Sequence, residues 1–326
     1  MFLEEAIKTL QEKRDLSEEQ CKGVIEEIIE GKGDAATFLK LLHEKGETAE
    51  ELCGTAKAMQ EKMIPVKAPF PLLDIVGTGG DGSHSVNIST GSAILVAASG
   101  VKVAKHGNRA SSSKCGSADV LEALGISLDQ DPLKSLEKVG ICFLYAPLFH
   151  PAMKVVAPIR KALGIRTVFN LIGPLLNPAR PDFLFLGVAK MELLDLFATA
   201  QQKLGGKKSL IVHGNGMDEL TPIGPCHLIE VTKEGKKAVT FDPKEYGFSR
   251  CTASDLKGGT KEENSRLLIE TFKGKKGPIG DTLILNAGVA LYLSEHVLSI
   301  QEGISLAQKT LEEGKAFDLL ERWKKL

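Results

Sequence analysis

From Leu72 onward, short apolar runs alternate along the chain with segments of helical periodicity. Such alternation is typical of an α/β domain, in which a mainly parallel sheet is covered by helices. The apolar runs predict strands over residues 72–76, 101–105, 141–145, 183–188, 209–212 and 227–231. The periodic segments predict helices over residues 91–98, 117–124, 191–204, 263–272 and 281–293, and one final helix after Ser299.

The first 63 residues show helical patterns only. Ser17 with Gln20, and Thr48 with Glu51, have the spacing of capping boxes, and glycines follow where helices should end. We expect four short helices, whose apolar stripes either pack internally or form an interaction face. The predicted fold class is α/β, with a small all-helical N-terminal domain and a large α/β domain. We expect the helical domain over 1–65, joined by helices from about 151–180, and the α/β domain over 66–326.

The charge balance of the 326 residues limits the partners to expect. Lys and Arg (41) nearly cancel Asp and Glu (42), so nothing favours a nucleic acid or a membrane surface. No apolar stretch is long enough to predict a membrane span. The six cysteines lie far apart without a C-x-x-C pair, which argues against a disulfide framework or zinc site and fits a reducing cytoplasm.

Four glycines lie within residues 77–82, directly after the first predicted strand. They permit tight or left-handed turns and leave backbone N–H groups uncovered. Ser89 and Thr90 are expected just before the helix at 91–98, where N–H groups and hydroxyls together bind anions. The alternative is a plain strand–turn–helix joint, since the stretch matches neither G-x-G-x-x-G nor a P-loop.

A second strand–loop–helix stretch spans residues 105–119. Its possible phosphate ligands are the cations of Lys105, Arg109 and Lys114 and the hydroxyls of Ser111, Ser112, Ser113 and Ser117. Ser117 suits the N-cap of the helix that follows. Two such loops close in sequence suit a ligand with two separated phosphate groups, although a solvated basic loop is the alternative.

Asp218 and Glu219 follow the apolar run at 209–212. Adjacent carboxylates beyond the C-terminal end of a strand fit a Mg²⁺ site, because Mg²⁺ prefers oxygen ligands and shares its shell with water and phosphates. Taken alone, the pair is equally compatible with an ordinary acidic surface.

Seven motifs in a fixed order carry a family resemblance. They are GTGGD (77–81), NIST (87–90), KHGNR (105–109), GSADVLEALG (116–125), HPAMK (150–154), RTVFNLIGPLLNP (166–178) and VHGNGMDE (212–219). Together they resemble the anthranilate phosphoribosyltransferase family over residues 74–219, with weaker similarity over the N-terminal helices and residues 263–293. The resemblance implies Mg²⁺-dependent transfer of the phosphoribosyl group of 5-phosphoribosyl 1-diphosphate to anthranilate, releasing diphosphate, as the second step of tryptophan biosynthesis from chorismate.

The resemblance also implies roles for individual residues. The sugar diphosphate is expected to contact Gly77, Gly79, Gly80, Asp81, Asn87, Ser89, Thr90, Lys105, Asn108, Ser113 and Ser117. Anthranilate is expected to contact Gly77, His106, Asn108, His150, Met153 and Arg160. Two Mg²⁺ ions are expected, held by Ser89, Asp218 and Glu219. A homodimer through the N-terminal helices is implied as well.

Some positions are given no role even with the resemblance, and others would be interpreted differently without it. Cys115 stands where the family usually has serine, and because a thiol donates poorly we assign it no ligand contact, although nearby cations could lower its pKa. His84 is given no role and no general base is named. Read alone, His150 is a capping or structural histidine and Arg160 a surface arginine.

Two rival functions remain. A pyrimidine nucleoside phosphorylase shares the resembling fold, but it would use free phosphate, and KHGNR combined with Asp218 and Glu219 speaks against it. A nucleic-acid-binding relative would show a basic excess and eroded motifs. A substituted anthranilate remains open as the acceptor.

Overall fold

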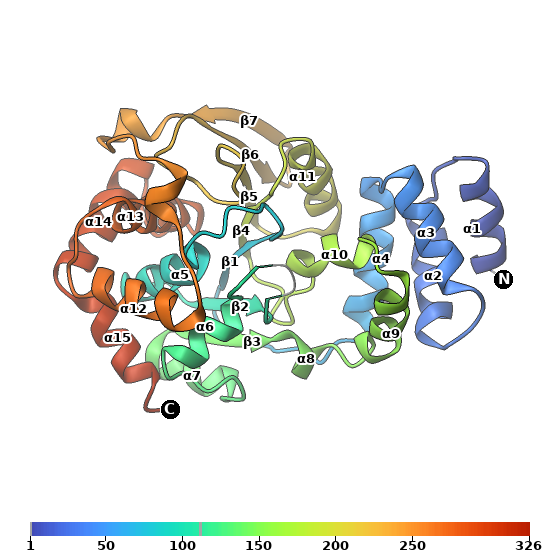
Figure 1. Ribbon diagram of the computed structural model, residues 1–326, viewed down its shortest axis with the longest axis horizontal. Helices are drawn as coiled ribbons and strands as arrows, with labels where there is room; N and C mark the ends of the chain where they lie inside the picture. Colours follow the sequence, from blue (N-terminus) through green and yellow to red (C-terminus); the bar gives the residue numbers. More distant parts are fainter. Residues whose placement is uncertain (1, 111–112) are drawn as a thin grey trace.

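The computed structural model describes residues 2–110 and 113–326, and one seven-stranded sheet forms its centre (Figure 1). The strands lie in the order β3-β2-β1-β4-β5-β6-β7. Their bounds are β1 Leu73–Gly77, β2 Val103–Gly107, β3 Ile141–Tyr145, β4 Phe183–Gly187, β5 Lys208–His213, β6 Cys226–Thr232 and β7 Lys236–Phe241. Strands β1 to β5 pair in parallel and β6 and β7 antiparallel, which confirms a mainly parallel sheet.

The two faces of the sheet bury two different apolar clusters. Along β4, Phe183 and Phe185 face one cluster, while Leu184 and Leu186 face the other, as the two-residue period of a strand requires. The first cluster contains residues of α5 Ile88–Ala98, α6 Ser117–Ala123, α12 Lys261–Phe272, α13 Pro278–Leu293, α14 Ile300–Glu312 and α15 Lys315–Trp323. The helix α11 (Leu193–Leu204) covers the opposite face.

The predicted N-terminal helices are confirmed, and both capping boxes form as expected. The helices are α1 Phe2–Gln11, α2 Glu18–Ile29, α3 Ala35–Lys45 and α4 Ala49–Glu61. Their apolar side chains join those of α11, β4 and β5 in one cluster, so the helical layer and the sheet share a core. The helices α9 (Met153–Leu163) and α10 (Val168–Leu171) also pack against this layer (Figure 1). The boundary at residue 65 stays a prediction.

Several local predictions were wrong. The helix α5 begins at Ile88, so Ser89 and Thr90 lie in its first turn and not before it. Gly116, not Ser117, caps α6, and the carboxylate of Asp119 accepts from the Gly116 N–H. The expected final helix is two helices, because the chain turns at Gly314 with a left-handed backbone.

Other elements had no sequence prediction. They are α7 Pro132–Val139, α8 Ala146–Phe149, the strand β7, and short 3₁₀ turns at Gly173–Leu175, Pro243–Tyr246 and Ala253–Leu256. Five of the six residues of β7 are exposed, which removes the apolar signal on which the other strands were found. Among the described residues, no helix combines the length and apolar character that crossing a membrane requires.

The strand order indicates where a ligand should bind. From β1 the chain adds β2 and β3 on one side of the sheet, and then β4 and β5 on the other side of β1. In open α/β sheets, ligands bind in the crevice beyond the carboxyl ends of the strands where the order reverses. That crevice lies between β1 and β4, and the residues that follow β1, β2 and β5 are the motifs singled out above.

Candidate active site

The glycine loop, residues 77–82, leaves the carboxyl end of β1. Gly79, Gly80 and Gly82 have φ values of 67°, 75° and 73°, a left-handed backbone that glycine adopts without steric cost. The Thr78 N–H donates to the carbonyl of Gly187 at 2.9 Å, which fastens the loop to the end of β4. The loop therefore lies across the β1/β4 crevice.

Asp218 and Glu219 approach the same crevice from β5. A tight turn at 214–217 precedes them, and the Gly79 N–H donates to Asp218 Oδ2 at 2.7 Å. Glu219 is 7% exposed, and its Oε1 accepts from the Ser89 N–H of α5 at 3.1 Å. A Cβ on Gly77 would collide with the Asp218 carboxylate, so the absence of a side chain at Gly77 allows the carboxylate to reach the glycine loop.

The electrostatics of this cluster favour a bound cation. Burial, reinforced by Asp81, raises the pKa of Asp218 to about 7, and burial together with Asp218 raises the pKa of Glu219 well above its usual range. Lys105 is 2% exposed, and its Nζ donates to Ser89 Oγ at 3.2 Å, while burial lowers its pKa. One lysine cannot balance three neighbouring carboxylates, so a divalent cation with oxygen ligands fits this site.

Two buried oxygens in this region lack partners. Neither Asp81 Oδ2 nor Thr90 Oγ1 forms a hydrogen bond to any described residue. Buried polar atoms normally find a partner, so these are places for an ion, water or substrate. In residues 2–110 and 113–326, no three His, Cys, Asp or Glu side chains form a complete metal cage. A Mg²⁺ ion that takes part of its shell from water and phosphate needs no such cage.

Asn87 joins the second loop, residues 105–117, to the helix α12. Its Nδ2 donates to the Cys115 carbonyl at 3.2 Å, and its Oδ1 accepts from Asn264 Nδ2 at 2.8 Å and from Cys115 Sγ at 3.3 Å. Burial raises the pKa of the Cys115 thiol to about 11, so the suggestion that nearby cations lower it was wrong. Cys115 helps to fix the loop and is not an activated thiol.

The cation of Arg109 is already paired. Its guanidinium donates to Glu122 Oε2 at 2.6 Å and Oε1 at 2.8 Å, and to Asp119 at 3.1 Å. The hydroxyl of Ser117 donates to the Asn108 carbonyl at 3.2 Å, which closes the loop on itself. The hydroxyl of Ser113 donates to the Cys115 carbonyl at 3.4 Å. Ser111 and Ser112 lie outside the described residues.

His106 and His150 form a buried pair beyond the end of β2. Their Nε2 atoms are 3.2 Å apart, and the rings meet edge to face with centroids separated by 5.1 Å. Burial lowers the pKa of His106 to about 3 and that of His150 to about 4. Both imidazoles are therefore neutral at pH 7, and one donates its Nε2 proton to the other.

The helix α9 carries the remaining predicted acceptor residues. Met153 and Arg160 are separated by seven residues, which places them on one side of the helix about two turns apart, and both are half-buried. Among the described residues, the guanidinium of Arg160 forms neither a hydrogen bond nor an ion pair, and burial lowers its pKa. A half-buried guanidinium without a partner is suited to an anionic ligand.

The sequence analysis missed Asp74 and Asn177, which lie below the site. Asp74 is fully buried in β1; its Oδ1 accepts from the His106 N–H at 3.3 Å and its Oδ2 from Asn177 Nδ2 at 2.7 Å. Asn177 Nδ2 also donates to the Ala104 carbonyl at 2.8 Å. Two sequence signals could have identified them. Asp74 is an aspartate inside an apolar strand, and Asn177 belongs to the Asn-Pro that ends the RTVFNLIGPLLNP motif.

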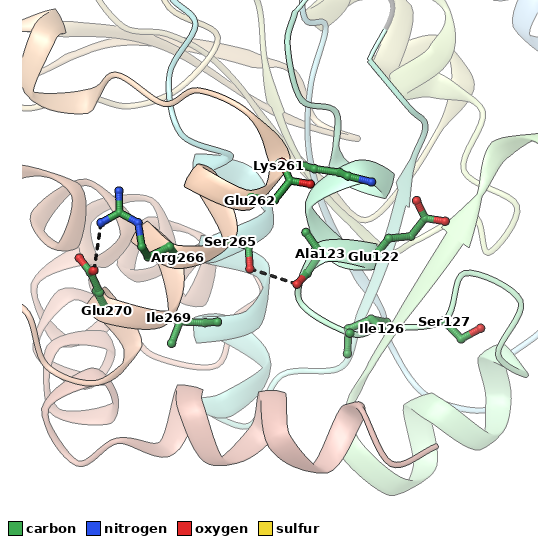
Figure 2. Close-up of a pocket in the computed structure, with 11 residues that line it drawn as sticks. Glu122, Ala123, Ile126, Ser127, Lys261, Glu262, Ser265, Arg266, Ile269 and Glu270 are labelled. Carbon is green, nitrogen blue, oxygen red and sulfur yellow. Dashed lines mark hydrogen bonds and ion pairs between the residues drawn. The ribbon is translucent and has the colours of Figure 1, made fainter.

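A separate depression of about 890 Å³ lies between α6 and α12 (Figure 2). Ser265 of α12 donates to the Ala123 carbonyl at 3.2 Å across it, and Arg266 pairs with Glu270 at 3.3 Å. Glu122 lines this depression and also binds Arg109, so the depression lies on the outer side of the second loop. None of the predicted substrate or metal residues lines it.

Comparison with known proteins identifies the family. Residues 4–63 match the helical bundle domain of a glycosyl transferase family, and residues 70–317 match the a/b domain of that family. The anthranilate phosphoribosyltransferase of Methanosarcina mazei is 46% identical over 96% of this chain and 86% of its own length. The chain belongs to the anthranilate phosphoribosyltransferase family.

Solved structures of family members agree with this assignment. The enzyme of Thermus thermophilus is 44% identical, with a TM-score of 0.90 over 98% of both chains. The yeast enzyme in complex with PRPP and Mg is 31% identical, with a TM-score of 0.89 over 99% of this chain and 97% of that one. The yeast enzyme has also been solved with 4-fluoroanthranilate, at 30% identity and a TM-score of 0.87 over 99% and 96% of the two chains. The protein is therefore an enzyme, and the two rival functions are excluded.

Proposed function

We propose that the β1/β4 crevice carries out the family's reaction with the residues described above. The chain is an anthranilate phosphoribosyltransferase of tryptophan biosynthesis. The observation that carries the residue assignment is the meeting of the glycine loop with Asp218 and Glu219 where the strand order reverses. The sugar diphosphate occupies this crevice, and anthranilate enters between the histidine pair and α9.

The donor end is built for phosphate. The left-handed glycine loop and the first turn of α5 present backbone N–H groups and the hydroxyls of Ser89 and Thr90 to the diphosphate. The second loop, with Asn108, Ser113 and Ser117, surrounds the phosphoribosyl group. Because the guanidinium of Arg109 is already paired with Glu122 and Asp119, Arg109 contributes little to phosphate binding in this loop.

The acceptor end positions a planar anion. Arg160 lacks a partner among the described residues, and a guanidinium binds a carboxylate through two parallel hydrogen bonds that fix its orientation. The neutral pair of His106 and His150 forms an uncharged wall that does not repel the cationic ribose of the transition state. A neutral aromatic amine is already a nucleophile, so orientation supplies most of the rate enhancement and no general base is named.

Asp218, Glu219 and Ser89 are the proposed ligands of two Mg²⁺ ions. A yeast relative has been solved with Mg, and the buried carboxylates here fit such an ion. Bound there, Mg²⁺ neutralises negative charge on the leaving diphosphate. A Mn²⁺ titration followed by electron paramagnetic resonance, with the sugar diphosphate present, should show two ions per chain; a single ion would contradict the count.

One assay tests the whole assignment. With Mg²⁺ and 5-phosphoribosyl 1-diphosphate, the wild-type protein should consume anthranilate, followed as loss of its fluorescence. The double variant Asp218→Asn/Glu219→Gln should lose this activity, because it keeps size but removes the charge that holds the metal. The double variant Glu312→Gln/Glu313→Gln, which neutralises an exposed adjacent pair at the end of α14, is the matched control. Near-normal turnover of the first double variant at low Mg²⁺ would refute the metal assignment.

A homodimer through the helical layer and a cytoplasmic location complete the proposal. Exposed apolar side chains lie in and beside this layer, among them Phe2, Ile64 and Val155, at 45%, 52% and 39% exposure. Light scattering should give twice the chain mass of 35.0 kDa, and a monomer at micromolar concentration would contradict the dimer. All six cysteines are free, which fits a reducing compartment.

A further inference from the structure

Arg166 stands in a short connection between two helices that fix its backbone. The helix α9 ends at Gly164, which has a φ of 65°, and α10 is capped by Thr167, whose N–H donates to Asn170 Oδ1 at 2.9 Å. A left-handed glycine at one end and a capping box at the other leave little freedom between them. The exposed side chain of Arg166 is thus presented from a defined position.

The guanidinium of Arg166 lies directly against the glycine loop. A Cβ built on Gly80 would be 3.3 Å from both Nη1 and Nη2 of Arg166. Within residues 2–110 and 113–326, Arg166 forms no ion pair and no hydrogen bond, whereas Arg109 is held by Glu122 and Asp119. Arg166 therefore differs from an arginine placed by surface salt bridges, because its guanidinium lies beside the left-handed backbone of Gly80 and pairs with no described carboxylate.

This arrangement provides two kinds of donor to one anion. The glycine loop presents backbone N–H groups, and the planar guanidinium presents a fork that matches phosphate oxygens. We propose that Arg166 binds the diphosphate group of the sugar diphosphate, opposite the glycine loop. This inference rests on the proposed function of that loop, and it adds a residue to which the family resemblance assigned no role.

Arg166 and the glycine loop belong to different parts of the molecule. Arg166 follows α9, which packs against the helical layer, whereas the glycine loop extends from the central sheet. A diphosphate held by both connects these two parts of the molecule. Arg160 lies in the last turn of α9, six residues before Arg166. Residues 160–166 therefore contact the acceptor through Arg160 and the leaving group through Arg166.

Calorimetric titration in the presence of Mg²⁺ tests the proposal, with 5-phosphoribosyl 1-diphosphate and inorganic diphosphate as separate ligands. Arg166→Gln should weaken both by roughly 10- to 100-fold, as expected for losing a charge-assisted contact. Arg166→Lys should recover part of that loss, because it restores the charge without the fork. The KM for anthranilate should stay unchanged. Lys161→Gln, at an exposed position on the same segment, is the control and should bind both ligands normally.

The outcomes separate this proposal from the proposed function. If the wild-type protein does not bind the sugar diphosphate, both fail. If the wild type binds it and Arg166→Gln binds equally well, only the role of Arg166 is refuted. If Arg166→Gln binds diphosphate normally but has a raised KM for anthranilate, Arg166 contacts the acceptor and the proposed contact with diphosphate is wrong. Equal melting temperatures of Arg166→Gln and the wild type would show that the variant is folded, so that a lower affinity reflects the lost contact.

Discussion

Replacing Gly187 with alanine should disable the metal site although no proposed ligand is substituted. Gly187 ends β4, and a Cβ there would penetrate the carbonyl group of Asp218 and lie 3.1 Å from its Cα. The obstacle is backbone, so it cannot be relieved by rotating a side chain. To reach the ordinary contact distance of about 3.5 Å, the backbone at Asp218 must retreat by roughly 1–2 Å.

The displacement sets the expected magnitude. A misplacement of about 1 Å at a reacting centre costs on the order of 100-fold in rate, so kcat/KM should fall by at least about that factor. The overpacking itself should lower the free energy of unfolding by about 1–3 kcal/mol. The backbone of Gly187 is not left-handed, so the effect is steric and does not come from backbone strain.

Steady-state kinetics at varied Mg²⁺, with denaturant unfolding on the same preparations, would measure both effects. Gly235→Ala, in the turn between β6 and β7, is the matched control, because a Cβ at Gly235 meets nothing within 4 Å and its backbone is not left-handed either. The control should keep both its activity and its stability. If Gly187→Ala folds and keeps kcat/KM within about threefold of wild type, the position of Asp218 does not govern catalysis and the reasoning fails.

Three further outcomes are expected. Arg160→Ala should lower kcat/KM for anthranilate by roughly 10- to 100-fold and leave calorimetric binding of the sugar diphosphate unchanged, with Lys161→Ala as control. The pKa values of His106 and His150, lowered by burial to about 3 and about 4, mean that between pH 6.5 and 4 the unfolded chain binds protons that the folded chain does not. The contribution of the two neutral imidazoles to the free energy of unfolding is therefore fully present above pH 6.5 and is lost as the pH falls. In urea unfolding at several pH values, His150→Gln should reduce the slope of this loss by up to about 1.4 kcal/mol per pH unit. An unchanged slope would contradict burial of a neutral His150 ring. Because burial raises the pKa of Cys115 to about 11, mass spectrometry should find it unlabelled by iodoacetamide at pH 7.5 until the protein unfolds, and rapid labelling of the native enzyme would disprove this.

The buried strands were predictable because parallel strands covered on both faces are apolar throughout, as β3 and β4 are. The strand β7 was not predictable, since five of its six residues are exposed and only Phe241 is buried. The predicted start of a helix was wrong where the first turn contains polar residues that take part in the site. Ser89 is such a residue, because its N–H binds Glu219.

The site shows the same division between local and distant information. The motifs identified which residues matter, but not which of them would meet. The charge of Arg109 suggested a phosphate ligand, and only the fold brings Glu122 and Asp119 to neutralise it. Lys105 was expected to contact the sugar diphosphate, and only the fold shows that its buried Nζ lies next to Ser89. Pairings of this kind depend on how loops and helices fold against the sheet, which no short sequence window contains.

The apolar cluster that extends from α1 to β5 limits how such a chain can be shortened or recombined. Without the four N-terminal helices, Leu184 and Leu186 of β4 and Ile211 of β5 would lose part of their cover, together with one side of α11. An exposed apolar surface of that kind promotes aggregation. The helical bundle is therefore not a detachable module, and a chimera that exchanged it for a relative's bundle would have to exchange the facing side of the sheet as well.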